Sequence, residues 1–300
     1  MSKSQQVQLD ATLRQGAFDP KGDVAELRSG FDALMRTIPV PSDVRKASTA
    51  VGGVDAVEVT VDGIDSANVI LYFHGGVYVI GSADSSVPLV ADLARRTNAK
   101  VISVNYRLAP ENPYPAAVED ARATYEGLIS QGVDSSNIAI CGESAGGGLT
   151  AAVLLALRDA DVPMPSSAFV MSPWADLTLS GSSIVDKQGV DPILTEEALR
   201  LRVADYVASA NSSDPFISPV FADLRGLPPM LIQVGSHEVL LSDAVRLAER
   251  AANADVEVTL EVVPGVPHVF QAYATVLDEG DAALDRAATF LNAHFGATQG

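Results

Sequence analysis

The sequence predicts an α/β fold in which helices flank a mostly parallel central sheet. Two observations support this prediction. From Val57 onward, short apolar runs rich in β-branched residues alternate with segments whose apolar residues recur at helical spacing. Most of the short runs are apolar throughout, which is typical of strands buried on both faces of a parallel sheet. Strands that alternate with helices indicate a sheet with helices on both faces.

The expected elements follow one another without internal repeats. The first strand, Ala56–Val61, alternates between apolar and polar residues, as a half-exposed strand does. The other expected strands are Asn68–Gly76, Lys100–Arg107, Asn137–Gly142, Ser167–Ser172, Pro229–Gly235 and Val256–Val263. The expected helices are Val87–Thr97, Ala116–Ser130, Ala145–Arg158, Ser242–Ala254 and Asp281–His294.

Residues 1–45 and 181–213 lie outside this alternation and divide the core into residues 46–180 and 214–300. Their apolar residues at helical spacing are Leu27, Phe31, Leu34 and Met35 in the first region and Leu199, Val203 and Tyr206 in the second. The two regions could pack together as a cap over the sheet. The alternative is a set of peripheral helices without a functional role.

Composition narrows the partners and the compartment. The formal net charge of −18 argues against nucleic acid or an anionic membrane as a partner, because both would repel the chain. A single cysteine, Cys141, excludes an internal disulfide framework and fits a reducing compartment. The first residues, MSKSQQVQLD, lack the apolar segment of a signal peptide. We therefore expect a cytoplasmic protein.

The strongest chemical signal is the pentapeptide Gly142-Glu143-Ser144-Ala145-Gly146, which stands between an expected strand and an expected helix. A G-x-S-x-G sequence in this position is a nucleophile elbow, which predicts Ser144 as the nucleophile. A phosphate-binding loop is excluded because Gly148 stands where that motif needs lysine. A glycine-rich turn without chemistry is the plain alternative. Cys141 lies inside the strand and is expected to be a small buried hydrophobe.

The segment His74-Gly75-Gly76 follows an earlier buried strand and predicts an oxyanion hole. Glycines allow the backbone to approach a substrate and to aim N–H groups at a developing negative charge. The expected donors are the N–H groups of Gly75 and Gly76, with Ala145 supplying a third. His74 is expected to brace this loop rather than to act as a base. A glycine turn alone is the alternative.

His268 is the expected general base because prolines and a glycine hold its loop after the last strand, and because histidine titrates near neutral pH. Glu238 is the expected acid, three residues beyond the strand that ends at Gly235. Asp243 is the rival acid, and we expect it to cap the next helix. His237 is expected to face the loop or solvent. His237-Glu238 lacks the H-E-x-x-H partner, so no metal and no cofactor are expected.

Six ordered motifs make the chain resemble the hormone-sensitive-lipase-like family of α/β-hydrolases, in particular its bacterial esterases. They are HGGVYVIGS, NYRLAPENPYPAAVED, GESAGGG, SPWADL, DPFISPVFADLRGLPPMLIQVGSHEVLLSDA and GVPHVF. The resemblance implies an α/β-hydrolase fold with a small helical cap made of residues 1–45 and 181–213. It also implies that Arg107 and Glu111 brace the oxyanion region, whereas the plain alternative is a salt bridge in the core.

Three positions depart from the pattern of that family. Val77 stands where a third glycine is usual, Glu143 where many members have Asp, and Glu238 where Asp is usual. The side chain of Val77 is expected to narrow the pocket toward bulky esters.

The resemblance implies a serine carboxylesterase that acts on short- to medium-chain esters through Ser144, His268 and Glu238. A lactone or amide hydrolase with the same residues is an alternative, and so is a non-catalytic ligand receptor on the same fold. The expected partner is a small-molecule ester. Some members of the family pair through the last strand and helix, so a homodimer is an alternative to a monomer.

Overall fold

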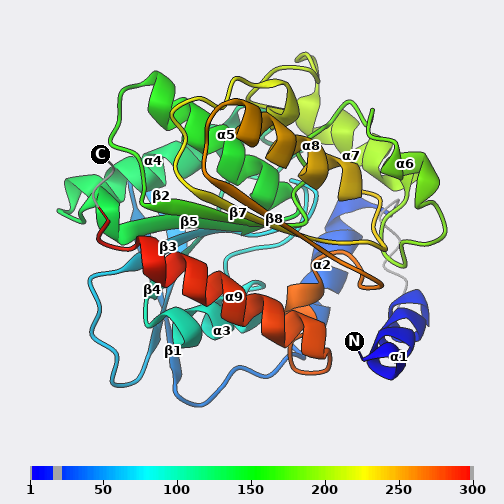
Figure 1. The fold of residues 1–300 in the computed structure, drawn as a ribbon, viewed down its shortest axis with the longest axis horizontal. Helices are drawn as coiled ribbons and strands as arrows, with labels where there is room; N and C mark the ends of the chain where they lie inside the picture. Colours follow the sequence, from blue (N-terminus) through cyan, green and yellow to red (C-terminus); the bar gives the residue numbers. More distant parts are fainter. Residues whose placement is uncertain (1, 16–21, 298–300) are drawn as a thin grey trace.

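The computed structural model describes residues 2–15 and 22–297, which contain one eight-stranded sheet with the order β1-β2-β4-β3-β5-β6-β7-β8 (Figure 1). Residues 1, 16–21 and 298–300, which the predicted regions 1–45 and 214–300 include, lie outside the described residues. The strands are β1 (Val44–Val51), β2 (Val54–Val61), β3 (Val69–Phe73), β4 (Lys100–Val104), β5 (Ile138–Glu143), β6 (Ser167–Met171), β7 (Met230–Gly235) and β8 (Val258–Val263). β2 is antiparallel to β1 and β4, and the remaining neighbours are parallel. The predicted fold class is confirmed.

β1 is a strand that the sequence analysis missed. Its residues are mostly exposed, so the run has neither the alternation nor the continuous apolar character by which strands are recognised. Gly52 and Gly53, with φ of 61° and 80°, turn the chain directly back into β2. A two-residue turn in which both residues have positive φ is a common connection between antiparallel strands. The hairpin, rather than burial of its own side chains, therefore makes β1 a strand.

Helices cover both faces of the sheet, as predicted. On one face lie α3 (Val87–Thr97) and α9 (Asp278–His294), and on the other lie α4 (Ala116–Ser130), α5 (Ala145–Asp159) and α8 (Leu241–Asn253) (Figure 1). Side chains of β3 alternate between the two layers: Ile70 and Tyr72 pack with α3 and α9, whereas Leu71 and Phe73 pack with the helices opposite. Burial on both faces explains why β3 is apolar throughout.

The two regions outside the alternation contribute further helices at one end of the molecule (Figure 1). These are α1 (Lys3–Gln15), α2 (Val24–Met35), α6 (Ser183–Asp186) and α7 (Glu196–Val207). The predicted apolar faces belong to α2 and α7. The Arg14 guanidinium of α1 donates to the carbonyl of Val190 at 2.9 Å, so the two regions touch. The domain boundaries themselves stay a prediction.

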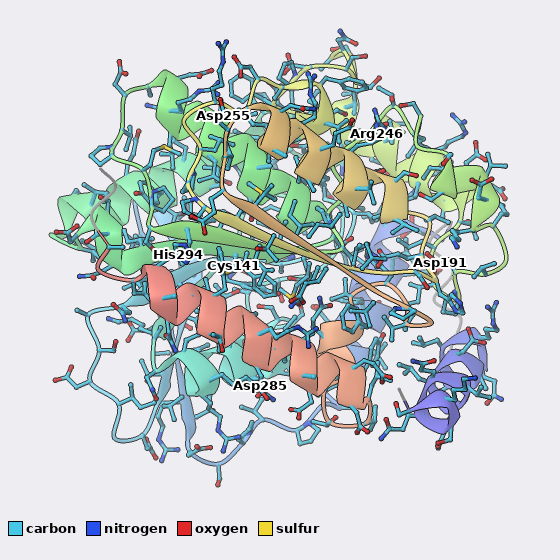
Figure 2. All side chains as sticks on the ribbon, in the orientation of Figure 1. Cys141, Asp191, Arg246, Asp255, Asp285 and His294 are labelled. Carbon is cyan, nitrogen blue, oxygen red and sulfur yellow. The ribbon has the colours of Figure 1, made fainter. Side chains whose placement is uncertain are left out.

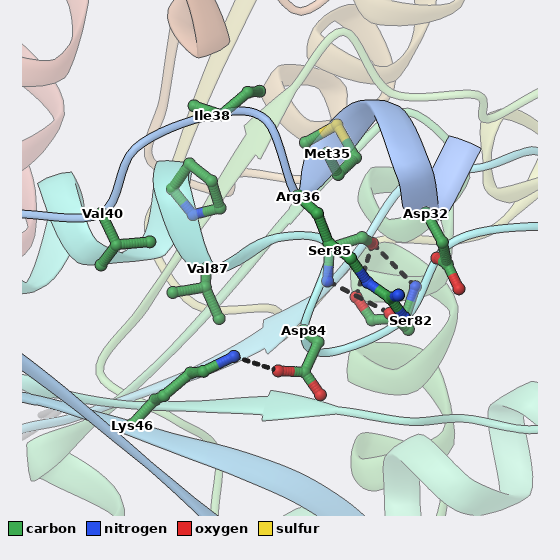
Figure 3. Close-up of a pocket in the computed structure, with 11 residues that line it drawn as sticks. Asp32, Met35, Arg36, Ile38, Val40, Lys46, Ser82, Asp84, Ser85 and Val87 are labelled. Carbon is green, nitrogen blue, oxygen red and sulfur yellow. Dashed lines mark hydrogen bonds and ion pairs between the residues drawn. The ribbon is translucent and has the colours of Figure 1, made fainter. Parts of the chain in front are cut away.

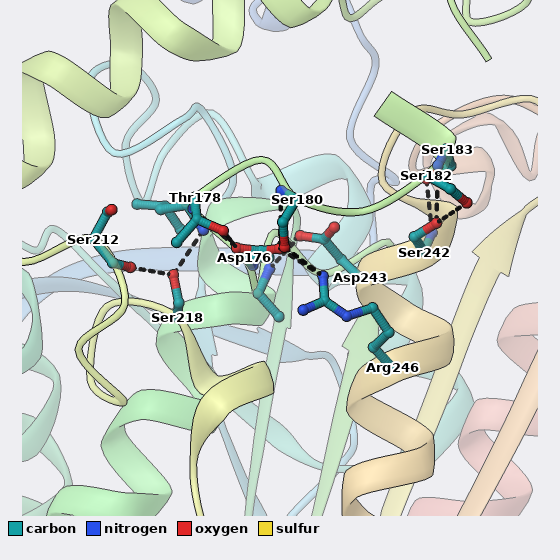
Figure 4. A network of polar contacts seen from close by, with 12 residues as sticks. Asp176, Thr178, Ser180, Ser182, Ser183, Ser212, Ser218, Ser242, Asp243 and Arg246 are labelled. Atoms are coloured by element: carbon teal, nitrogen blue, oxygen red, sulfur yellow. Dashed lines mark hydrogen bonds and ion pairs between the residues drawn. The ribbon is translucent and has the colours of Figure 1, made fainter. Parts of the chain in front are cut away.

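A polar network anchors the chain where it leaves β6 and enters the region 181–213, which is an insertion between β6 and β7 (Figure 4). The Asp243 carboxylate accepts the N–H groups of Ala175 and Asp176 at 3.0 and 2.9 Å. The Asp176 carboxylate in turn accepts a bond from Arg246 at 2.5 Å. Asp243 lies in the first turn of α8, as predicted, but the prediction that it caps this helix is wrong, because Leu240 occupies the cap position and the Asp243 side chain is fully buried. Burial and the neighbouring Asp176 raise the pKa of Asp243 well above its ordinary value.

Candidate active site

The turn from β5 into α5 holds Ser144 in a conformation that L-residues rarely adopt, with φ 54° and ψ −121°. The glycines on either side are required by space. A Cβ on Gly142 would lie 2.3 Å from the carbonyl oxygen of Gly146, and a Cβ on Gly146 would lie 1.9 Å from that of Phe73. The Ser144 N–H donates to Met171 of the neighbouring strand at 2.9 Å. This close packing presents the Ser144 side chain at the carboxyl edge of the sheet, as the pentapeptide predicts.

The structure brings the predicted base and acid into direct contact. His268 Nδ1 lies 2.7 Å from Glu238 Oε2, and both side chains are buried. The other Glu238 oxygen accepts the Gly235 N–H at 2.6 Å and the Ser172 hydroxyl at 2.8 Å. A carboxylate with these contacts holds the imidazole in one orientation, with a proton on Nδ1 and Nε2 left as the basic nitrogen.

Ser172 is a residue of the site that the sequence analysis missed. Its hydroxyl donates to Glu238 and accepts the Val269 N–H at 3.0 Å, so it ties the acid to the loop of the base. The available signal was its place directly after β6, at the edge of the sheet where the other predicted residues meet. Serine is common at strand ends, so the position alone does not indicate this role.

The environment of His268 favours its charged form. Burial lowers the pKa of His268. The hydrogen bond and charge of Glu238, together with the charges of Asp191 and Glu143, raise this pKa by more than burial lowers it, so the net shift is upward. The imidazolium that forms when His268 accepts a proton is therefore stabilised within a buried site.

The oxyanion loop requires one correction. Gly75 was predicted as a donor, but its N–H already donates to Glu143 Oε1 at 2.7 Å. The assignment of Gly75 as an oxyanion donor is wrong because its N–H is already engaged in a hydrogen bond with the Glu143 carboxylate. The N–H groups of Gly76, Val77 and Ala145 have no acceptor within the described residues.

Three successive residues of this loop have positive φ: Gly76 at 116°, Val77 at 51° and Tyr78 at 63°. The Val79 and Ile80 N–H groups both donate to the Gly76 carbonyl at 2.9 Å, which closes the turn. Positive φ is unusual for a β-branched residue such as Val77 and persists only where the surroundings hold it. A tight turn of this kind gathers successive backbone N–H groups into a concave donor site.

Glu143 and His74 hold this loop from two sides. Glu143 accepts the Gly75 N–H and the Tyr72 hydroxyl, and burial raises its pKa to about 7. His74 Nδ1 lies 2.7 Å from the Gly75 carbonyl, and its ring stacks on Tyr106 at 4.3 Å between centroids. Burial lowers the pKa of His74 to about 4, so it is neutral at physiological pH and Nδ1 donates to that carbonyl. His74 thus braces the loop, as predicted.

Arg107 and Glu111 do not pair with each other. Arg107 binds the buried Asp120 of α4 at 2.9 Å and forms no hydrogen bond with the oxyanion loop within residues 2–15 and 22–297. Glu111 binds Arg28 at 2.7 Å, and the Arg28 guanidinium also donates to the Val79 carbonyl at 2.8 Å. The implied bracing role is therefore wrong for Arg107, whereas Glu111 acts on the loop through a residue of α2.

An apolar pocket of about 250 Å³ opens beside Ser144 and His268. Its other walls come from the oxyanion loop with Val77, from α3, from α1 and α2 through Leu13, Phe31, Leu34 and Met35, and from the insertion through Pro192, Ile193 and Leu194. Both regions outside the core alternation therefore form part of its wall. A second, polar cavity of about 460 Å³ adjoins it, with Met35 and Ser85 lining both (Figure 3). Lys46 and Asp84 form an ion pair across its floor.

The remaining candidates lie elsewhere. Cys141 is fully buried within the core, where Figure 2 labels it. His237 is exposed, and His294 is half-buried against Phe290. The described residues hold no group of three side chains suited to a metal ion. Among the helices of residues 2–15 and 22–297, none has the length and apolar character needed to cross a membrane.

Comparisons with known proteins agree with this geometry. Residues 70–272 match the model of a family with the α/β-hydrolase fold. The chain is 44% identical over 222 residues to an acetyl-hydrolase of Streptomyces hygroscopicus, covering 74% of each protein. It is 38% identical over 265 residues to an esterase of Acinetobacter venetianus, covering 88% of this chain and 87% of the relative.

Solved structures are similar over the whole length. An esterase from the bacterial hormone-sensitive lipase family superposes with a TM-score of 0.95 at 38% identity, covering 99% of this chain and all of that one. The chain therefore belongs to the bacterial hormone-sensitive lipase family of α/β-hydrolases. It is an enzyme of the carboxylic ester hydrolase class.

Replacement of Glu143 tests its hold on the oxyanion loop. Glu143→Ala frees the Gly75 N–H, so we expect kcat for ester hydrolysis to fall about 10- to 100-fold. Glu143→Gln keeps an acceptor for that hydrogen and should lose much less. Steady-state kinetics of both variants, with the exposed Glu249→Ala as the control, provide the measurement. Equal losses in the Ala and Gln variants would contradict a role based on the Gly75 hydrogen bond.

Proposed function

We propose that this enzyme is a serine esterase that hydrolyses short- to medium-chain carboxylic esters through Ser144, His268 and Glu238. The observation that carries the proposal is the 2.7 Å contact between His268 and Glu238 beside the pocket that Ser144 lines. A nucleophile and a base that line one pocket, with an acid that orients the base from behind, are the groups that acyl transfer requires.

Hydrolysis would proceed in two halves. The Ser144 hydroxyl attacks the ester carbonyl carbon while His268 Nε2 removes its proton, and the imidazolium is stabilised by Glu238. His268 then gives that proton to the departing alcohol, which leaves an acyl group on Ser144. Water attacks the acyl-enzyme while His268 takes its proton, and His268 then returns that proton to the Ser144 oxygen as the bond to the acyl carbon breaks and the acid product leaves. Apart from the ester and one water molecule, these steps use only side chains and backbone groups of this chain.

The N–H groups of Gly76, Val77 and Ala145 would stabilise the negative oxygen of each tetrahedral intermediate. Among the described residues these three groups have no acceptor, which supports the assignment, since buried N–H groups such as those of Val77 and Ala145 are otherwise almost always paired. Val77 in place of the usual third glycine supplies the same backbone group, because the contribution comes from the N–H rather than from the side chain.

The apolar pocket supports a short to medium acyl chain. Phe31, Ile193 and Leu194 line it, and its volume of about 250 Å³ lies just below the range of about 300–1,000 Å³ that is usual for pockets of drug-sized ligands, which favours a short or medium chain over a long one. Relatives point in the same direction: one is the acetyl-hydrolase of Streptomyces hygroscopicus and another is an ethyl acetate hydrolase of Pseudomonas putida, 32% identical over 234 residues. We infer a similar preference for this enzyme.

A substrate series with a nucleophile variant tests the proposal. We expect the wild type to hydrolyse nitrophenyl acetate and butyrate faster than laurate, and Ser144→Ala to lose this activity to background. Lactone and amide substrates serve as controls for the alternative hydrolase classes. Turnover retained by Ser144→Ala would exclude Ser144 as the nucleophile, and a lactone or amide preferred over every ester would transfer the activity to that class.

The two buried acids near the site can be separated by mutation. Glu238→Ala removes the group that orients and charges His268, so kcat should fall about 10³- to 10⁴-fold. Asp243→Ala should mainly lower the free energy of unfolding, by about 1–3 kcal/mol, because it leaves the Ala175 and Asp176 N–H groups unpaired. Kinetics and urea denaturation measure the two effects, and the opposite pattern would assign the catalytic role to Asp243.

The pH dependence reports the base. His268 must be neutral to accept the Ser144 proton, and its pKa is raised, so kcat/KM should rise with pH through an apparent pKa above the ordinary value of 6.5. The activity is lost as pH falls through that value, since the protonated ring has no free nitrogen. A profile that is flat from about pH 5 to 9 would contradict His268 as the base.

A further inference from the structure

One buried carboxylate outside the predicted set connects the pocket wall to the catalytic acid. Asp191 belongs to the insertion between β6 and β7, and its side chain is only 5% exposed. It lies at the end of the molecule that carries α1, α2 and α7 (Figure 2). Buried carboxylates require compensation by hydrogen bonds or charges, so the contacts of this group indicate what it holds in place.

The first oxygen of Asp191 holds the pocket wall. Oδ1 accepts the N–H groups of Ile193 and Leu194 at 2.8 and 2.9 Å. These two residues line the same apolar pocket as Ser144 and His268. The position of this part of the wall is therefore set by Asp191 rather than by packing of the insertion alone.

The second oxygen reaches the core. Asp191 Oδ2 accepts the Val239 N–H at 2.9 Å, and Val239 directly follows Glu238. Gly235 fixes the other side of the same loop by donating to Glu238. The Glu238 loop is thus held at both ends, once by the core strand β7 and once by the insertion.

We propose that Asp191 is a positioning residue that couples the wall of the acyl pocket to the Glu238–His268 pair. This inference rests on the proposed esterase function. It predicts that an acyl chain in contact with Ile193 and Leu194 affects the position of Asp191. The same Asp191 carboxylate holds the loop of the catalytic acid through Val239. The insertion then serves the chemistry as well as the enclosure of the pocket.

The charge of Asp191 supports the coupling. Its carboxylate raises the pKa of His268, together with Glu238 from the loop after β7 and Glu143 from β5. Asp191 itself faces His268, with Tyr273 of the His268 loop and Arg14 of α1 as further titratable neighbours. Burial raises the pKa of Asp191 above its ordinary value, and the charge of His268 and the three N–H donors offset only part of that shift.

Asp191→Asn tests the proposal because it removes the charge at nearly constant shape. An amide has one acceptor oxygen, so either the two wall contacts or the Val239 contact is lost. We expect kcat/KM for nitrophenyl butyrate to fall about tenfold. The apparent pKa of the acid limb should also fall by about 0.5 pH unit, because loss of a nearby negative charge makes His268 easier to deprotonate.

The matched control is Asp186→Asn, an exposed acid of the same insertion whose side chain makes no contact with the Glu238 loop in the described residues. It should leave both kcat/KM and the acid limb unchanged. Asp191→Ala, which loses all three contacts, should raise KM and lower kcat together. If Asp191→Ala does not fold, the kinetics and pH profile of Asp191→Asn decide the test. Thermal unfolding of Asp191→Asn then verifies that this variant is folded.

An Asp191→Asn enzyme that is folded and has the kcat/KM and pH profile of Asp186→Asn would overturn the proposal. A variant with reduced thermal stability but an unchanged pH profile would also overturn it, since that pattern belongs to a merely structural residue. Failure of the proposed function is recognised separately: the wild type would then lack esterase activity, or Ser144→Ala would retain it.

Discussion

The close approach of α5 to the ends of β3 and β5 is the constraint on which the site depends. A single added carbon at Gly146 would lie 1.9 Å from the Phe73 carbonyl oxygen. Only with hydrogen at this position can the helix begin directly after Ser144, with its free N–H groups beside the serine. The same approach brings Glu143 against Gly75, so the nucleophile turn and the oxyanion loop are one packed unit rather than two independent loops.

A second principle of the site is the control of buried negative charge. The chain is strongly acidic, yet the carboxylates that surround His268 are individually satisfied. Glu238 accepts a backbone N–H and a serine hydroxyl besides the imidazole, and Glu143 accepts a backbone N–H and a tyrosine hydroxyl. Asp191 accepts three backbone N–H groups. Each acid therefore fixes a loop while contributing to a field that favours the imidazolium.

Much of the fold was predictable because its signals are local. The strands and helices of the core have continuous apolar runs or helical spacing, and each predicted strand is present. β1 was missed because its pairing with β2, not its own pattern, makes it a strand. The glycines around Ser144 and at His74-Gly75-Gly76 were informative because a tight turn excludes side chains whatever the rest of the chain does.

The sequence by itself determined which residue types are available at the carboxyl edge of the sheet: one serine in a tight turn, one histidine after the last strand and an acid after β7. Only the tertiary structure decided how each group is used. Asp243 and Glu238 are both acids a few residues apart, but one faces the chain near Asp176 and the other faces His268. Gly75 and Gly76 are chemically identical neighbours, yet the Glu143 carboxylate accepts a hydrogen bond from the N–H of Gly75 and none from that of Gly76. Hydrogen-bond direction depends on groups brought together from distant parts of the chain, and no local pattern records it.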